Sequence, residues 1–235
     1  MQNNFQTFKA LGVFLYYPKP LWVSEVNELC DLIDDEALLP SQDRMAIRGL
    51  ANEISNSDIF DLQEEYVDMF DRVRALSLHL FEHVHGDSRE RGQAMIDLSD
   101  RYGEIGLNLA IGELPDFIPA FLEYLSLIPR KQALEDLDEV ADIMASIGKK
   151  LGARGSKYHC VFDALIKLVG RTPEQITEII NEPLSFAEID KEWEEIPMEF
   201  LGADAPKPTE CAPNLCGTCP SETQHKQPEL QGAQL

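Results

Sequence analysis

Large apolar residues recur every three or four positions along most of this chain, which is the spacing of one buried face on an α-helix. The stretches with this period are Trp22, Val26, Leu29 and Ile33; Ile47, Leu50, Ala51 and Ile54; Ile59, Leu62, Tyr66, Met69 and Phe70; Leu134, Leu137, Ala141, Met144, Ile147 and Leu151; and Tyr158, Phe162, Leu165 and Val169. No run of alternating β-branched residues is long enough to indicate a strand. The sequence therefore predicts an all-α fold, with roughly nine or ten helices over residues 3–200.

Capping signals and a change of composition divide the chain further. Asp87–Glu90 and Thr172–Gln175 are both typical of helix starts, since a short polar side chain precedes a Glu or Gln by three residues. Residues 202–235 contain five prolines, three glycines and three of the five cysteines. We therefore expect a single multi-helix domain over residues 1–201, followed by a flexible, Cys-containing tail over residues 202–235.

The charge of the chain restricts its partners. The sequence has 42 acidic and 20 basic side chains, which gives a formal charge of −22. Phosphate backbones and anionic lipids repel such a chain, so the composition argues against nucleic-acid binding and favours a basic partner.

The cysteines and the hydropathy predict a cytoplasmic protein. The five cysteines are odd in number and unevenly spaced, unlike the disulfide framework of a small secreted domain. The N-terminus has no basic region followed by an apolar run, and no uncharged apolar stretch approaches the roughly 20 residues that cross a bilayer. We therefore expect a chain without a signal peptide that is not an integral membrane protein.

One pattern in the helical region is typical of a metal site. His79, Glu82 and His83 spell H-x-x-E-H, in which two His side chains one helical turn apart bind Zn²⁺ and the Glu activates water. A zinc-dependent metalloenzyme is therefore an alternative function for this chain. The simpler interpretation is that these three side chains are hydrogen-bonded polar groups that hold the end of a helix to its neighbour.

The tail carries a second candidate metal site. Two cysteines in C-x-x-C spacing can bind one tetrahedral metal ion, and a further Cys and a His complete a set of four ligands: Cys211, Cys216, Cys219 and His225. The alternative is that these are reduced thiols on a flexible tail.

Three segments in the middle of the chain resemble a known family. The segments are Tyr66–Arg72, Leu80–Met95 and Glu113–Leu125, and the second of them reads LFEHVHGDSRERGQAM. They resemble the nitrate reductase molybdenum cofactor assembly chaperones, the NarJ or delta-subunit family, within the wider TorD-like group of all-helical chaperones. The likeness extends over roughly residues 8–200 in order and spacing.

The resemblance implies an assembly chaperone and not an enzyme. Such proteins bind the N-terminal segment of the catalytic (alpha) subunit of respiratory nitrate reductase and hold the apoenzyme open for insertion of the molybdenum guanine dinucleotide cofactor. They also delay docking to the membrane subunit, and they keep no cofactor bound themselves. Proteins of cofactor biosynthesis are further partners that it suggests. The position of His79 is commonly apolar in the family, and the Cys-containing tail is outside the shared pattern.

Two hypotheses follow for the client-binding residues. In the first, an amphipathic client helix lies in an apolar groove, and acidic side chains meet its basic residues. The candidate apolar anchors are Tyr66, Phe70, Leu80, Phe81 and Phe117, for each of which core packing is the alternative. In the second, a polar network braces two helices near the groove and responds to pH; its candidates are Glu82, His83, His85 and Arg89. Pro115 and Asp116 are expected to open the next helix, where the proline sets a hinge angle.

Overall fold

The computed structural model describes residues 5–84 and 89–172, all of which belong to one compact unit. The described part is helical, as predicted, and its only β-type pairing is an isolated antiparallel bridge between His79 and Phe117. The α-helices in this part are α1 (Gln6–Phe14), α2 (Pro20–Ser24), α3 (Val26–Glu36), α4 (Ser41–Asn56), α5 (Ile59–Tyr66), α6 (Arg89–Glu104), α7 (Ile118–Leu127), α8 (Arg130–Glu139), α9 (Ala141–Ala153) and α10 (His159–Leu168). Three short elements follow α5: the π-helix η1 (Val67–Asp71) and the 3₁₀ turns η2 (Arg74–Leu76) and η3 (Leu80–Glu82).

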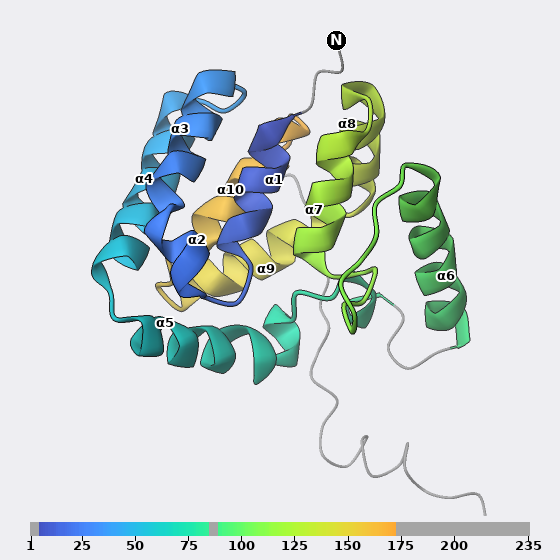
Figure 1. The fold of residues 1–235 in the computed structure, drawn as a ribbon, viewed down its shortest axis with the longest axis horizontal. Coiled ribbons are helices and arrows are strands. Elements are labelled where there is room, and N and C mark those ends of the chain that lie inside the picture. Colours follow the sequence, from blue (N-terminus) through green and yellow to red (C-terminus); the bar gives the residue numbers. More distant parts are fainter. Residues whose placement is uncertain (1–4, 85–88, 173–235) are drawn as a thin grey trace, which may run out of the picture. The chain divides into compact units, whose positions relative to one another are not determined.

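The core of the described region forms where the apolar stripes of these helices meet. Helix α1 packs against both α3 and α7, while α10 packs against α9 and α4 (Figure 1). Most side chains of the stripes predicted from the sequence are buried, and the core also takes in residues outside those stripes. The largest fully buried side chains of the described region include Phe8, Phe14, Tyr102 and Phe162. Each such side chain contributes roughly 1.5–3 kcal/mol through removal from water.

Two predicted helices are each divided in the structure. The stripe from Trp22 to Ile33 is divided at Glu25 into α2 and α3, and the stripe from Leu134 to Leu151 is divided at Val140 into α8 and α9. Both divisions occupy a single residue with non-helical dihedral angles, so the apolar spacing continues through them. A pattern of apolar residues therefore does not reveal a break of this kind.

The start of α7 lies later than predicted. Pro115 and Asp116 do not open the helix, because Phe117 is its N-cap residue and the helix begins at Ile118. Pro119 occupies the first turn, where the missing N–H of proline costs no helical hydrogen bond. The predicted helix start at Thr172–Gln175 and the tail from residue 202 lie outside the described residues.

The contact between α9 and α10 depends on a glycine. A Cβ atom added to Gly148 would lie 2.9 Å from Cβ of Phe162, which is closer than real carbon atoms approach. We expect Gly148→Ala to lower the free energy of unfolding by about 1–3 kcal/mol, because the two helices must move apart. Urea denaturation measures this change.

Gly49 in α4 is the matched control, because a Cβ atom there meets nothing within 4 Å. Gly49→Ala should raise stability by up to about 1 kcal/mol through helix propensity alone. Equal effects of the two substitutions would contradict the close contact between α9 and α10.

Candidate functional site

Asp116 joins two segments of the candidate site. Its carboxylate is fully buried; Oδ1 lies 3.1 Å from Nδ1 of His79, and Oδ2 accepts a hydrogen bond of 3.2 Å from the N–H of Phe81. The backbones also pair here, since the N–H of Leu80 donates to the carbonyl of Asp116 and the N–H of Ile118 donates to the carbonyl of Leu78. The segment 78–82 is therefore fixed to the residues that precede α7.

The zinc interpretation of His79, Glu82 and His83 is not supported by this geometry. His79 lies in the β-bridge and Glu82 in a 3₁₀ turn, so the pattern does not share one face of an α-helix. His83 is turned to a different partner, with Nε2 2.8 Å from the carbonyl oxygen of Ser77. Among residues 5–84 and 89–172, no three His, Cys, Asp or Glu side chains are grouped to hold a metal ion. The tail candidates Cys211, Cys216, Cys219 and His225 lie outside these residues.

The pKa values of His79 and His83 are shifted in opposite directions. Burial lowers the pKa of His83 below the ordinary value, whereas the hydrogen bond to Asp116 raises the pKa of His79. The structure thus makes His79, and not His83, the more readily protonated of the two. Of the other residues in the predicted network, His85 lies outside the described residues and Arg89 opens α6.

The candidate anchors divide into buried and partly exposed residues. Tyr66, Phe70 and Leu80 are buried in the core, the alternative that the sequence left open for each of them. Tyr66 donates a hydrogen bond of 2.9 Å from its hydroxyl to the carbonyl of Leu15. Phe81 and Phe117 are partly buried and pack against the same core. Of the five candidates, Phe81 and Phe117 therefore have more surface that a partner can reach than the three buried residues.

Pro115 also takes part in the core contacts through its backbone. Its carbonyl accepts a hydrogen bond of 2.8 Å from the hydroxyl of Tyr102, a buried residue of α6. The ring of Tyr102 packs against that of Tyr124 in α7, with centroids 5.0 Å apart. These contacts hold α6 to the loop before α7.

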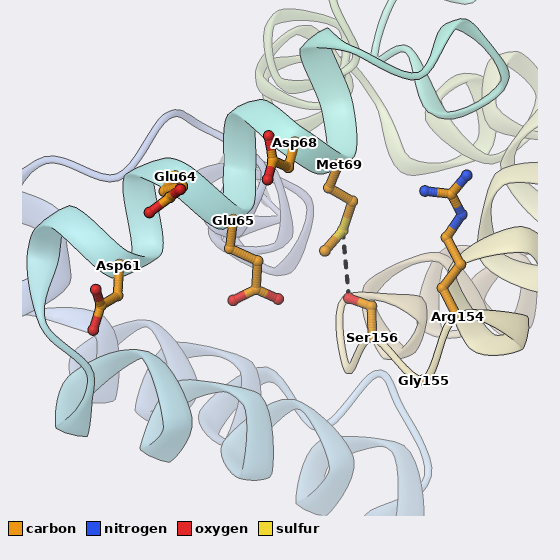
Figure 2. Close-up of a pocket in the computed structure, with 8 residues that line it drawn as sticks. All are labelled: Asp61, Glu64, Glu65, Asp68, Met69, Arg154, Gly155 and Ser156. Atoms are coloured by element: carbon orange, nitrogen blue, oxygen red, sulfur yellow. Dashed lines mark hydrogen bonds between the residues drawn. The ribbon is translucent and has the colours of Figure 1, made fainter.

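A cavity of about 510 Å³, which we name the acidic cavity, opens beside α5. Figure 2 shows four carboxylates from α5 and η1 on one side of it, with Arg154, Gly155 and Ser156 of the α9–α10 connection across from them. Met69 closes one end, and its sulfur lies 3.4 Å from the hydroxyl of Ser156. The four carboxylates belong to Asp61, Glu64, Glu65 and Asp68.

The acidic cavity was missed at the level of sequence, although a signal for it exists. Its four carboxylates stand at positions i, i+3, i+4 and i+7, the spacing that places side chains on one face of a helix. Desolvation, together with the nearby charge of Glu53 in α4, raises the pKa of Glu65. A row of carboxylates on one helix face favours a cation beside it.

A second cavity, of about 420 Å³, lies beyond the π-helix η1 and has mixed charge. We name it the arginine-lined cavity; its lining residues are Phe70, Asp71, Arg72, Arg74, Ser77, Glu82 and Arg91. Arg72 pairs with Asp68, and Arg91 lies 3.7 Å from a carboxylate oxygen of Glu82. Three arginines, Arg72, Arg74 and Arg91, thus share this cavity with the carboxylates of Asp71 and Glu82.

Comparison with known proteins identifies the family. Residues 36–162 match the model of the nitrate reductase delta subunit family, and this range contains the lining residues of both cavities and the Asp116 contacts. The chain belongs to the nitrate reductase delta subunit family.

Relatives of known name cover most of the chain. The nitrate reductase molybdenum cofactor assembly chaperone NarJ of Escherichia coli K12 is 38% identical over 193 residues, covering 80% of this chain and 81% of the relative. NarW of the same organism, named a probable chaperone of the same kind, is 37% identical over 205 residues, covering 85% and 86%.

A solved structure shares the delta-subunit fold. The crystal structure of a protein assigned to redox enzyme maturation in Archaeoglobus fulgidus superposes with a TM-score of 0.52 at 20% identity. It covers 73% of this chain and 97% of the solved chain. At this identity the likeness supports the helical fold alone.

The role of Tyr66 in this delta-subunit family member can be tested by removing one atom. Tyr66→Phe leaves the carbonyl of Leu15 without its buried donor, so we expect the free energy of unfolding to fall by about 1 kcal/mol. Thermal or urea unfolding measures the loss. Tyr17→Phe is the control, because Tyr17 is 38% exposed and should change little; equal losses would argue against the Tyr66 hydrogen bond.

Proposed function

We propose that this chain is a cytoplasmic assembly chaperone for respiratory nitrate reductase. It binds the basic N-terminal segment of the apo catalytic (alpha) subunit, keeps that subunit competent for insertion of the molybdenum guanine dinucleotide cofactor, and prevents premature docking to the membrane subunit. The chaperone keeps no cofactor of its own. Membership of the delta-subunit family and the printed names of NarJ and NarW support this proposal.

The acidic cavity is the observation that supports a particular binding surface for this peptide. Its carboxylates attract the Lys and Arg side chains of a basic peptide, and Arg154 and Ser156 limit where such a side chain can enter. On the same helix, Phe60 is 74% exposed next to Asp61 and one turn before Glu64. A surface that combines an exposed aromatic ring with a row of carboxylates suits a helix that is apolar on one face and basic on the other.

The small free energy of each exposed ion pair means that several weak contacts together recognise the peptide. An exposed ion pair contributes about 0.2–1 kcal/mol, so no single carboxylate determines the affinity. The net charge of −22 adds a long-range attraction that raises the rate of encounter with a basic segment at low ionic strength. Salt at 0.1 M screens this attraction over about 10 Å, so binding should weaken as salt is added.

None of the helices in the described part of the chain is long and apolar enough to span a bilayer.

Calorimetric titration with the N-terminal peptide of the alpha subunit from the same organism tests the proposal. We expect stoichiometric binding that weakens with salt. The double variant Asp61→Asn, Glu64→Gln should weaken binding by roughly two- to thirtyfold, because two exposed charge contacts are removed.

The control removes the same charge from another helix. The double variant Glu28→Gln, Asp35→Asn neutralises two exposed carboxylates of α3, so it changes the net charge equally and leaves the acidic cavity intact. Equal losses for both double variants would mean that the peptide responds only to total charge. If the unaltered chain bound no peptide at low salt, the proposed client would be wrong.

A further inference from the structure

Three chain segments meet at the carboxylate of Asp116. His79 and Phe81 reach it from the segment around η3, and the backbone of Asp116 itself continues into α7. The third segment is α6, since a guanidinium nitrogen of Arg91 lies 4.0 Å from Oδ2 of Asp116. A fully buried carboxylate requires such partners, because an ion removed from water without them is strongly destabilising.

Of these partners, only His79 changes its charge near neutral pH. The side chain of His79 is 31% exposed, so protons reach it from solvent. Within residues 5–84 and 89–172, the charged groups that face it are Asp116 before α7, Glu82 in η3 and Arg91 in α6. Two carboxylates and one guanidinium leave a net negative surrounding for the imidazole. On its other side the ring packs against Phe117, with centroids 5.4 Å apart.

We propose that His79 and Asp116 form a proton-controlled latch that holds the segment 78–82 against the start of α7. With Nδ1 beside the carboxylate, a proton on Nε2 gives the ring a positive charge and makes the contact an ion pair. Without this proton the neutral imidazole still donates its Nδ1–H to the carboxylate, but the attraction between two opposite full charges is lost. This inference does not rest on the proposed function, because it concerns contacts within the chain.

The direction of the effect follows from the pKa of His79. The contact with Asp116 raises this pKa, so the closed segment binds a proton more tightly than the open segment does. The latch is therefore fully stabilised below the ordinary histidine pKa and loses this stabilisation as pH rises through the raised value. The ratio of closed to open segments falls about tenfold for each pKa unit by which closure raises the value.

Opening of the latch has a structural consequence beyond His79. Ser77 and Glu82 lie on either side of the latched residues, and both line the arginine-lined cavity. Between them, the N–H of Leu80 donates to the carbonyl of Asp116, so opening breaks this bond in one short segment and leaves the rest of the fold in place. Loss of the proton would thus loosen one wall of the arginine-lined cavity while leaving the helices in place.

Amide hydrogen exchange by NMR between pH 6 and pH 8.5 tests the latch on the full chain. The reporters are the N–H groups of Leu80 and Ile118, which donate across the two segments. After correction for the intrinsic rate, their protection should fall as pH rises, while that of Ala133, which donates to Pro129, stays constant. The His79 ring signals should titrate above the ordinary histidine pKa.

Substitutions separate the proton from the hydrogen bond. His79→Asn retains an N–H donor without a titratable charge, so the pH dependence of both reporters should disappear. His159→Asn is the matched control, because His159 pairs with Asp163 at 2.8 Å in α10 and lies far along the chain from the latch. This variant should keep the pH dependence of the unaltered chain.

Three results would overturn the latch: constant protection of Leu80 and Ile118 in the unaltered chain, an undiminished pH dependence in His79→Asn, or titration of His79 at or below the ordinary value. The peptide titration described above is independent of each of them. A chain that fails to bind the client peptide can still show the latch, and the reverse also holds.

Discussion

A buried carboxylate needs hydrogen-bond or ion-pair partners wherever it lies, and at Asp116 this requirement joins the segment around η3, helix α6 and the start of α7. Removing the charge from water is tolerable only because His79, the Phe81 amide and Arg91 surround it. Those partners come from the segment before α6 and from α6 itself, while Asp116 lies among the residues leading into α7. The part of the arginine-lined cavity formed by Glu82 and Arg91 therefore lies against one fully buried side chain.

The fold could be predicted from sequence because its signal is local and repeated. The helical period recurs in segment after segment, and the side chains that show it are those that the structure buries. The helix breaks at Glu25 and Val140 were not predicted, because one non-helical residue leaves the spacing of the apolar residues unchanged. The start of α7 was predicted too early for a different reason. Pro115 and Pro119 both suit the first turn of a helix, and the long-range contacts of Asp116 decide between them.

The site was less predictable, since its contacts join residues far apart in the chain. His79 and Asp116 are separated by 37 positions, and nothing local to either indicates the other. The H-x-x-E-H spelling suggested a helix face, whereas the local backbone forms a bridge and a 3₁₀ turn. Aromatic residues were chosen as anchors for their size, yet size also makes Tyr66 and Phe70 good core residues. The carboxylate row of α5 was visible in the sequence, but it resembles any solvated helix face until Arg154 and Ser156 are placed opposite it.

The π-helix η1 separates two cavities of different charge. Asp68 and Met69 line the acidic cavity, while Phe70 and Asp71, the next two residues, line the arginine-lined cavity. A π-turn contains one residue more than an α-turn, so removing a residue between Val67 and Asp71 would turn the remaining residues of this element by about 100° around its axis. Related chains can therefore alter either cavity by substitution, whereas a change of length in η1 would exchange the residues that the two cavities receive.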